Sequence, residues 1–226
     1  PRFAISCSHE MLHAAGQFAA KHDLPVQTHI AENGSEIEAV RQLFPDRRDY
    51  LDVYEHYGLL TDKMILAHCI WLSDNEWQRV GDSGARVSHC PDSNFFLGSG
   101  QMDTRRPDAL DIPWGLGTDV GGGRTFSLRK IVSSAYDTAR ITGSDISPEA
   151  LLWRATTGGA QVLGYGERVG LVQPGFDADL IAIQLEKEHP TDLDQLINRH
   201  VFRHDAGPVA ATFVRGRCLY ARDKQR

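Results

Sequence analysis

Met64-Ile65-Leu66-Ala67-His68 is a short apolar run that ends in a histidine, and runs of this kind decide the fold class. They recur along the first 165 residues and are separated by longer amphipathic stretches. This alternation predicts strand–helix units and therefore an α/β fold built on a parallel sheet. We predict strands at Phe3–Ser6, Pro25–His29, Met64–His68, Ala85–His89 and Trp114–Thr118.

Helix signals occupy the stretches between the predicted strands. Apolar residues recur at helical intervals from Ser8 to Lys21 and from Glu36 to Phe44. Ser73 and Glu76 have the spacing of a capping box, which predicts a helix beginning there, and Ser83-Gly84 is typical of its end. No linker or low-complexity segment interrupts these units, so we predict one continuous α/β body.

The pattern changes after Gly166. Residues 168–183 predict two short strands around a Pro-Gly turn. Val209–Val214 and Cys218–Tyr220 flank an Arg-Gly-Arg turn and predict a hairpin. We therefore divide the chain into an α/β body over residues 1–165 and a small β module over residues 166–226.

Composition excludes several classes of protein. The chain has 226 residues and a net charge of −6, without a block of Lys and Arg, so nucleic acid is not an expected partner. No apolar run reaches the ~18–20 residues that span a bilayer, and no signal-type segment opens the chain, so we expect a cytoplasmic protein without a membrane partner. The four cysteines are widely spaced, and we expect buried thiols rather than disulfides.

The residues that end the predicted strands carry the chemistry. His29, His68, His89 and Asp119 each follow an apolar run, between 21 and 39 residues apart. Those separations allow a strand, a crossover helix and a return, and the carboxyl ends of parallel strands meet on one face. Two imidazoles and a carboxylate suit zinc, or ferrous iron, with a position left for water. We predict a metal site at His29, His68 and Asp119.

Other polar residues near these strand ends receive separate interpretations. Glu32, three residues after His29, could carry a proton from an attacking water to a leaving nitrogen, which is the chemistry of hydrolysis. We interpret His89 as a structural residue in preference to a metal ligand. Residues 88–94, which include it, could line the pocket or brace the next loop. Glu36 and Glu38 are expected on a solvated helix face. Gly121-Gly122-Gly123 predicts a wide turn rather than a phosphate loop.

Four motifs together resemble the amidohydrolase superfamily. They are Thr28-His29-Ile30-Ala31-Glu32, Ala67-His68, Ser88-His89-Cys90-Pro91-Asp92-Ser93-Asn94 and Gly117-Thr118-Asp119-Val120-Gly121. The opening Pro1-Arg2-Phe3 and the stretch from Glu36 to Leu60 are similar to the guanine deaminase family within it.

The resemblance implies a fold, a cofactor and an activity. It implies strands four to eight of a TIM-type barrel with a β-sandwich portion, one zinc ion per subunit, a homodimer, and hydrolysis of guanine to xanthine and ammonia. His29, His68 and Asp119 would be metal ligands, and Asp119 would also accept the proton of the water. Glu32 would protonate the purine and the departing amine, while Arg2, Phe3 and His29 would contact the substrate.

One departure from the family pattern is large. No His-x-His occurs in the chain, although the family places such a pair after its first barrel strand. We therefore expect the C-terminal half of such an enzyme, with weak metal binding and incomplete activity by itself. The alternatives are another aminohydrolase acting on an adenosine-like, cytosine-like or triazine substrate, and a metal-free scaffold relative without activity.

Overall fold

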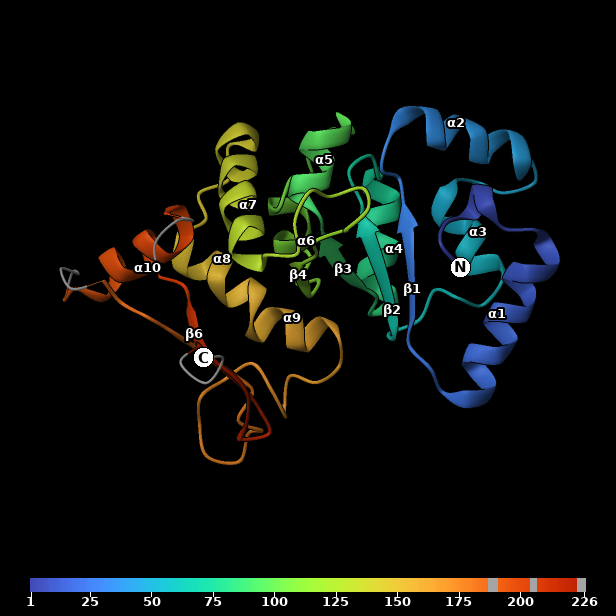
Figure 1. Ribbon diagram of the computed structural model, residues 1–226. Coiled ribbons are helices and arrows are strands. Elements are labelled where there is room, and N and C mark those ends of the chain that lie inside the picture. Colours follow the sequence, from blue (N-terminus) through green and yellow to red (C-terminus); the bar gives the residue numbers. More distant parts are fainter. Residues whose placement is uncertain (187–190, 204–206, 223–226) are drawn as a thin grey trace.

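The computed structural model describes residues 1–186, 191–203 and 207–222. Its main body is a parallel sheet in the order β1-β2-β3-β4, with helices along one side (Figure 1). The strands are β1 (Val26–Ile30), β2 (Met64–His68), β3 (Arg86–His89) and β4 (Trp114–Leu116). The prediction of a parallel sheet in an α/β fold is confirmed, and these four strands agree with the predicted runs.

Eleven helical segments are present in the described residues. They are η1 (Ala4–Ser6), α1 (His9–His22), α2 (Gly34–Leu43), α3 (Tyr50–His56), α4 (Asp74–Ser83), α5 (Pro91–Leu97), α6 (Arg105–Ala109), α7 (Leu128–Thr142), α8 (Pro148–Ala155), α9 (Thr157–Val162) and α10 (Leu193–Phe202). The predicted capping box is confirmed at α4, where the Ser73 and Glu76 side chains each bond the backbone of the other. Gly84 ends the helix in the left-handed conformation that glycine adopts without strain.

Burial explains why the strands read as continuous apolar runs. All five residues of β2 are buried: the strand is paired on both sides, one face packs against the helices, and Ile65 and Ala67 on the other face line the floor of a cavity. On the helix side the core contains Leu66, Val87 and Trp114 together with Leu12 and Tyr54 from the covering helices. The registers of the three pairings bring His29, His68, His89 and Leu116 to the same end of the sheet.

The predicted strand at Phe3–Ser6 is wrong: residues 4–6 form a 3-10 turn. The reason is the buried hydroxyl of Tyr54, which accepts from the backbone N–H of Ala4 (3.0 Å) and donates to the carbonyl of His29 (2.7 Å). It occupies the place where a neighbouring strand would pair with β1. Only Arg2 keeps a strand-like contact, since its carbonyl accepts from the His29 N–H at 2.9 Å.

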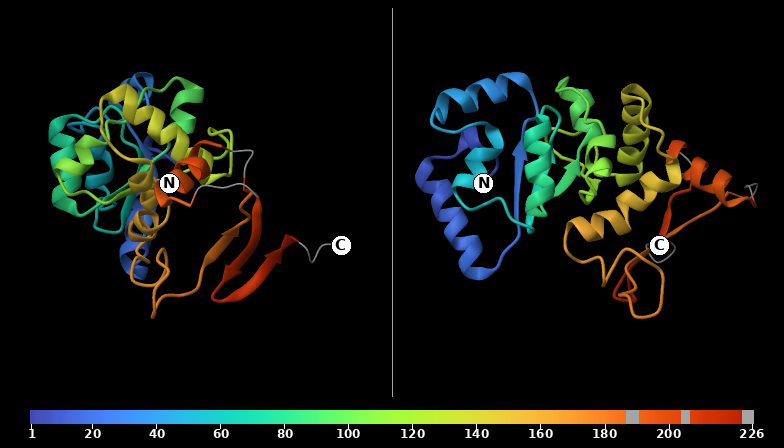
Figure 2. Two further views of the ribbon diagram at one scale, coloured as in Figure 1. Left: turned by 90° about the vertical axis from the view of Figure 1, so that its left-hand side faces the viewer. Right: turned by 180° about the vertical axis from the view of Figure 1, so that it is seen from behind.

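The C-terminal module is a three-stranded antiparallel sheet in the order β5-β6-β7, seen beside the main body in Figure 2. Its strands are β5 (Leu180–Ile183), β6 (Val209–Val214) and β7 (Arg217–Ala221), so the predicted hairpin is confirmed. The first strand predicted within residues 168–183 is wrong. That segment forms turns held by local bonds, such as that from the Asp177 N–H to the Arg168 carbonyl at 2.7 Å.

Two smaller expectations concern the cysteines and the membrane. All four cysteines are free, but only Cys69 and Cys90 are buried. Cys7 is half-buried, and Cys218 is exposed because it lies on β7 at the edge of the small sheet, so the prediction of a buried thiol is wrong at both positions. In the part of the chain that the structure describes, no helix has both the length and the apolar character needed to cross a bilayer.

Candidate functional site

Three side chains predicted as metal ligands converge at the carboxyl ends of the strands. One ligand atom from each of His29, His68 and Asp119 lies within 4.8 Å of the others. The Nε2 atoms of His29 and His68 lie 3.6 and 4.0 Å from the two carboxylate oxygens of Asp119. Two ligands of a tetrahedral zinc ion, each ~2.1 Å from the metal, lie ~3.4 Å apart. The spacing therefore suits a shared cation.

A buried polar atom supports this interpretation. His68 is fully buried, and its Nε2 atom has no hydrogen-bond partner among the described residues. A buried nitrogen without a partner costs about 1–3 kcal/mol, which coordination of a metal would offset. The donor set of two imidazoles and one carboxylate fits zinc or ferrous iron.

The backbone is strained where the ligands leave their strands. His68 and Asp119 have φ angles of 72° and 45°, in the left-handed region that non-glycine residues rarely adopt. Side chains of a strand alternate between its faces, so the reversed backbone at His68 turns this side chain toward the other ligands. Such conformations persist where surrounding contacts determine them, and they cluster at functional sites.

His29 is oriented by the N-terminal segment. Its Nδ1 atom donates to the carbonyl of Arg2 at 2.8 Å, which leaves Nε2 free to face Asp119. The contact with Asp119 raises the pKa of His29 against the opposing effect of burial. Burial in turn raises the pKa of Asp119, but its contacts with His29 and Ser93 outweigh burial, and the net shift is downward.

The glycine run after Asp119 makes room for its carboxylate. A Cβ atom at Gly122 would lie 2.6 Å from Asp119 Oδ2 and 3.0 Å from Ser93 Oγ, closer than real Cβ contacts. The N–H of Gly122 donates back to the Asp119 carbonyl at 3.0 Å. The run is thus a tight turn closed by an i→i+3 hydrogen bond against Asp119, rather than the wide turn that the sequence predicts.

Glu32 lies beside the three ligands, with its Oε2 atom 3.9 Å from His68 Nε2. Ser99, a buried residue that the sequence did not indicate, donates to Glu32 Oε1 at 2.9 Å. Trp71 in turn fixes Ser99 by donating from its indole N–H to the Ser99 carbonyl at 2.8 Å. The Glu32 carboxylate therefore sits within reach of the candidate metal site and is held by a hydrogen bond.

The expectation that Glu36 lies on a solvated face is wrong, whereas Glu38 is half exposed. Glu36 is 5% exposed; it accepts from the Glu32 N–H at 2.8 Å and from the Tyr50 hydroxyl at 2.5 Å. The Asn33-x-x-Glu36 spacing of a capping box was the signal for this role. Glu36 therefore fixes the backbone of the candidate proton carrier.

Arg2 and Phe3 lie at the edge of the same region. The Phe3 ring is 6.2 Å from the His29 ring, and the exposed Arg2 guanidinium lies 4.8 Å from the centre of the Phe3 ring. The Arg2 carbonyl, rather than its side chain, makes the contacts with β1. The Arg2 side chain is thus available for a ligand.

His89 lies near His68 but is not part of the cluster of three candidate ligand atoms. It is fully buried on β3, its ring is packed edge-on against Trp114, and neither ring nitrogen has a partner among the described residues. Burial, together with the nearby His68, lowers the pKa of His89 to about 3. His89 is therefore a buried residue outside the cluster of candidate ligands, and its structural role stays a prediction.

We expect His89 to make folding sensitive to acid. Because the unfolded chain binds this proton with a pKa of about 6.5 and the folded chain does not, stability is lost as pH falls below 6.5, by about 2 kcal/mol at pH 5. We expect the free energy of unfolding, measured with urea and without added metal, to fall less between pH 7 and pH 5 in His89→Leu than in the parent protein. The exposed His13→Gln is the control. An unchanged pH dependence in His89→Leu would contradict the assignment.

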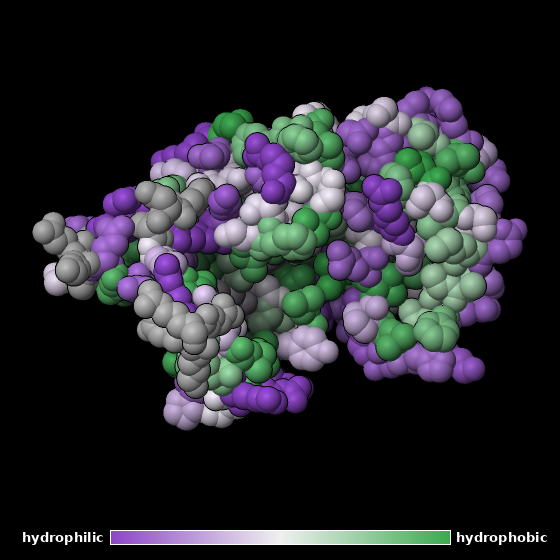
Figure 3. Space-filling model, in the orientation of Figure 1, coloured by the Kyte–Doolittle hydropathy of each residue, from purple (hydrophilic) through white to green (hydrophobic). Residues whose placement is uncertain are grey.

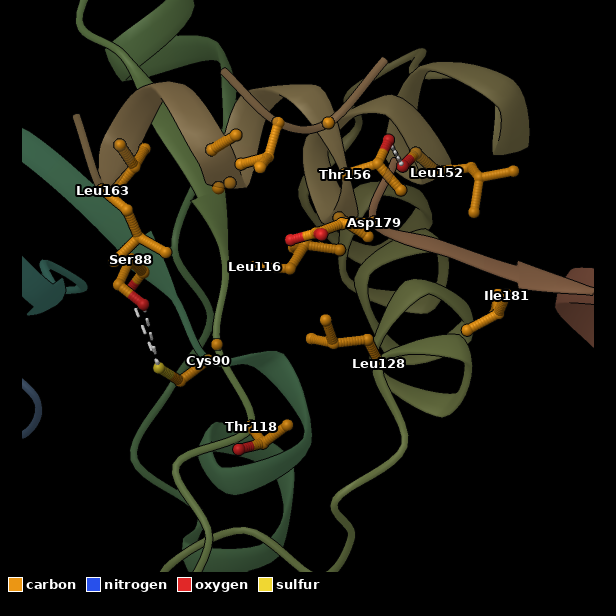
Figure 4. A pocket seen from close by; sticks show the side chains of 18 of the residues that line it. Ser88, Cys90, Leu116, Thr118, Leu128, Leu152, Thr156, Leu163, Asp179 and Ile181 are labelled. Carbon is orange, nitrogen blue, oxygen red and sulfur yellow. Dashed lines mark hydrogen bonds between the residues drawn. The ribbon is translucent and has the colours of Figure 1, made fainter. Parts of the chain in front are cut away.

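Two of the candidate ligands, His29 and Asp119, line a large cavity, whereas His68 is buried behind them. The cavity has a volume of about 1100 Å³. It is lined by the face of the parallel sheet that carries Ile65 and Ala67, by α8 and α9, and by β5 of the small module. His29 and Asp119 line it, together with apolar residues such as Leu116, Leu152 and Ile181 (Figure 4). Hydrophobic surface gathers around the hollow between the small module and the main body (Figure 3). The cavity therefore borders the candidate metal site and is lined largely by apolar side chains.

Comparison with known proteins agrees with this geometry. The model of the amidohydrolase family matches residues 1–219. The chain belongs to the amidohydrolase family. A probable guanine deaminase of Schizosaccharomyces pombe is 39% identical over 97% of this chain and 44% of its own length. The structure of E. coli guanine deaminase superposes with a TM-score of 0.93, at 32% identity, over 98% of this chain and 54% of that one.

A guanine deaminase from C. acetobutylicum, solved with guanine in its active site, superposes with a TM-score of 0.87 at 30% identity, over 97% of this chain and 54% of that one. This amidohydrolase chain therefore spans about half the length of the relatives it matches. The described residues contain four parallel strands, one fewer than the predicted strands four to eight because Phe3–Ser6 is not a strand; the prediction of a partial TIM-type barrel is confirmed.

Proposed function

We propose that the protein containing this chain hydrolyses guanine to xanthine and ammonia. The observation that carries the proposal is the convergence of His29, His68 and Asp119, with the Glu32 carboxylate 3.9 Å from His68 Nε2. The likeness to guanine deaminases over nearly the whole chain supports guanine as the substrate.

His29, His68 and Asp119 are the residues that would hold the metal. Zinc is the ion we propose, with ferrous iron as the alternative, because the donor set suits both. When bound, the ion would lower the pKa of water to about 7 and so supply hydroxide at neutral pH. In the complete protein, further ligands from outside this chain would complete the site.

Two carboxylates would handle the protons. Asp119, held at low pKa by His29 and Ser93 despite its burial, would accept the proton of the attacking water. Glu32 would take one proton of the attacking water and deliver it to the purine ring nitrogen, and it would then pass the proton accepted by Asp119 to the departing amine. One water molecule adds at the ring carbon that carries the amine, the carbon–nitrogen bond breaks, and ammonia leaves with the transferred protons.

The N-terminal segment would recognise the purine. A guanidinium has donors only, and Arg2 could therefore bond a purine carbonyl or an unprotonated ring nitrogen. Phe3 lies between Arg2 and His29 and would bound the pocket on that side. The backbone N–H of Ala4, directly after Phe3, donates to the buried hydroxyl of Tyr54. This buried contact supports the positions of the Arg2 and Phe3 side chains.

The direct test is turnover by the complete protein of guanine, adenine, cytosine and a triazine. We expect ammonia release with guanine alone. Turnover of another substrate with guanine inert would overturn the proposal in favour of a different aminohydrolase. Absence of zinc and iron by elemental analysis, with stability unaffected by a chelator, would favour a metal-free scaffold.

Arg2→Ala is expected to raise KM for guanine about 10- to 100-fold, the loss of one or two charged hydrogen bonds. Metal content should not change, because the backbone carbonyl that orients His29 remains in the variant. Steady-state kinetics and elemental analysis measure the two effects. The exposed Arg41→Ala is the control. An equal loss of metal and of substrate binding would show that Arg2 is structural.

A further inference from the structure

The first turn of α5 lies directly behind the candidate metal site. Residues 91–94 are all buried, and the turn follows β3 without a loop. Its Asn94 accepts a hydrogen bond at Oδ1 from Nδ1 of His68, at 2.9 Å, between two side chains that are both fully buried. None of the proposed proton transfers uses this contact.

The contact decides which nitrogen of His68 is free. A neutral imidazole carries one proton, and the nitrogen without it is the one that can bind a metal. With a carbonyl oxygen opposite Nδ1, the proton stays on Nδ1 and the lone pair on Nε2. That Nε2 is the atom near Asp119 and Glu32, at 4.0 and 3.9 Å.

Backbone hydrogen bonds fix the position of Asn94 in the turn, while its side-chain Nδ2 has no hydrogen-bond partner among the described residues, so the contact of Oδ1 with His68 is what defines the orientation of the amide. The Asn94 N–H donates to the Cys90 carbonyl at 3.1 Å, and its own carbonyl accepts from the Ser99 N–H at 3.0 Å. The reverse orientation of the amide would present its NH₂ group to Nδ1 and force the proton of His68 onto Nε2, where it would block a metal. The two orientations therefore have opposite chemical consequences.

The neighbouring residues of the turn, Asp92 and Ser93, lie close to Asp119, another of the candidate ligands, or to the loop that follows it. Asp92 accepts from the backbone N–H of Arg124 at 2.9 Å and from its guanidinium at 2.6 Å, which ties down the loop after Asp119. Ser93 lies beside the Asp119 carboxylate: a Cβ atom at Gly122 would lie 3.0 Å from Ser93 Oγ and 2.6 Å from Asp119 Oδ2. Three consecutive residues thus contact the surroundings of two ligands.

We propose that Asn94 is a positioning residue that fixes the tautomer of His68, so that Nε2 is free for the metal. The proposal rests on the metal site of the proposed function. It makes the α5 turn a support for metal binding rather than a part of the substrate pocket. Outer partners of this kind change metal affinity by about 10- to 100-fold when removed.

Two variants of the complete protein separate the roles of the amide. Asn94→Leu keeps the size of the side chain but removes the acceptor, whereas Asn94→Asp keeps an acceptor and cannot donate. Long-range ¹H–¹⁵N spectra of the metal-free protein report the tautomer of His68, and zinc competition with a chelator reports affinity. We expect protonated Nδ1 in the parent and in Asn94→Asp, and a mixed or reversed tautomer with about 10- to 100-fold weaker zinc binding in Asn94→Leu.

Several outcomes would overturn the role of Asn94. These are a proton on Nε2 of His68 in the parent protein, parental zinc affinity in Asn94→Leu, or failure of Asn94→Asp to restore affinity. The parental spectrum decides the tautomer even if Asn94→Leu does not fold. If the tautomer and the affinities are as expected but guanine is inert, the proposed substrate fails while the role of Asn94 stands.

Discussion

Glu32→Gln is expected to lower kcat for guanine about 10²- to 10⁴-fold while the metal content stays that of the parent. The amide has nearly the shape of the carboxylate and can still bond Ser99, but it cannot accept a proton and pass it to the amine. Glu32 is not one of the three converging ligands, so occupancy should not depend on its charge.

The matched control is Glu38→Gln. Glu38 lies six residues along the chain, is half exposed and pairs with Arg41 on the surface of α2. Steady-state kinetics on the complete proteins, with elemental analysis of each preparation, would measure both effects. A near-normal rate in Glu32→Gln, or a loss equal to that of Glu38→Gln, would contradict the assigned proton transfer.

Asp119→Asn should have the larger effect, at least about 10³-fold on kcat/KM, because it removes both an anionic ligand and a proton acceptor. Zinc affinity should fall by more than the ~10- to 100-fold expected for loss of an outer partner. The substitution preserves shape in a space that Gly122 leaves for it, so the fold should be retained.

Asp145→Asn provides the comparison, since Asp145 is fully exposed after α7. Chelator competition and circular dichroism would separate loss of metal from loss of structure. Parental zinc affinity in Asp119→Asn would remove Asp119 from the ligand set.

Much of the fold could be predicted from local patterns. The strands that contain Met64–His68 and Val26–Ile30 are short apolar runs, and their carboxyl ends meet because parallel strands share one direction. The capping box at Ser73 and Glu76 is a local signal as well. The candidate ligands were accessible to sequence analysis for the same reason: each lies at or shortly after the carboxyl end of its own apolar run.

Contacts between distant segments could not be predicted in this way. Tyr54 prevents a strand at Phe3–Ser6 through a hydroxyl more than forty residues away in the chain. Ser99 reaches Glu32 across 67 positions, and Asn94 reaches His68 across 26. No periodicity marks such residues, because their role comes from the packing of one loop or helix turn against another.

A crystal structure of the complete protein with zinc tests most directly whether His29, His68 and Asp119 share one metal ion. The data should be collected on both sides of the zinc absorption edge. We predict one anomalous peak within about 2.0–2.3 Å of His29 Nε2, His68 Nε2 and an Asp119 carboxylate oxygen. An anomalous peak elsewhere, or no peak between these three side chains at full zinc loading, would contradict the account.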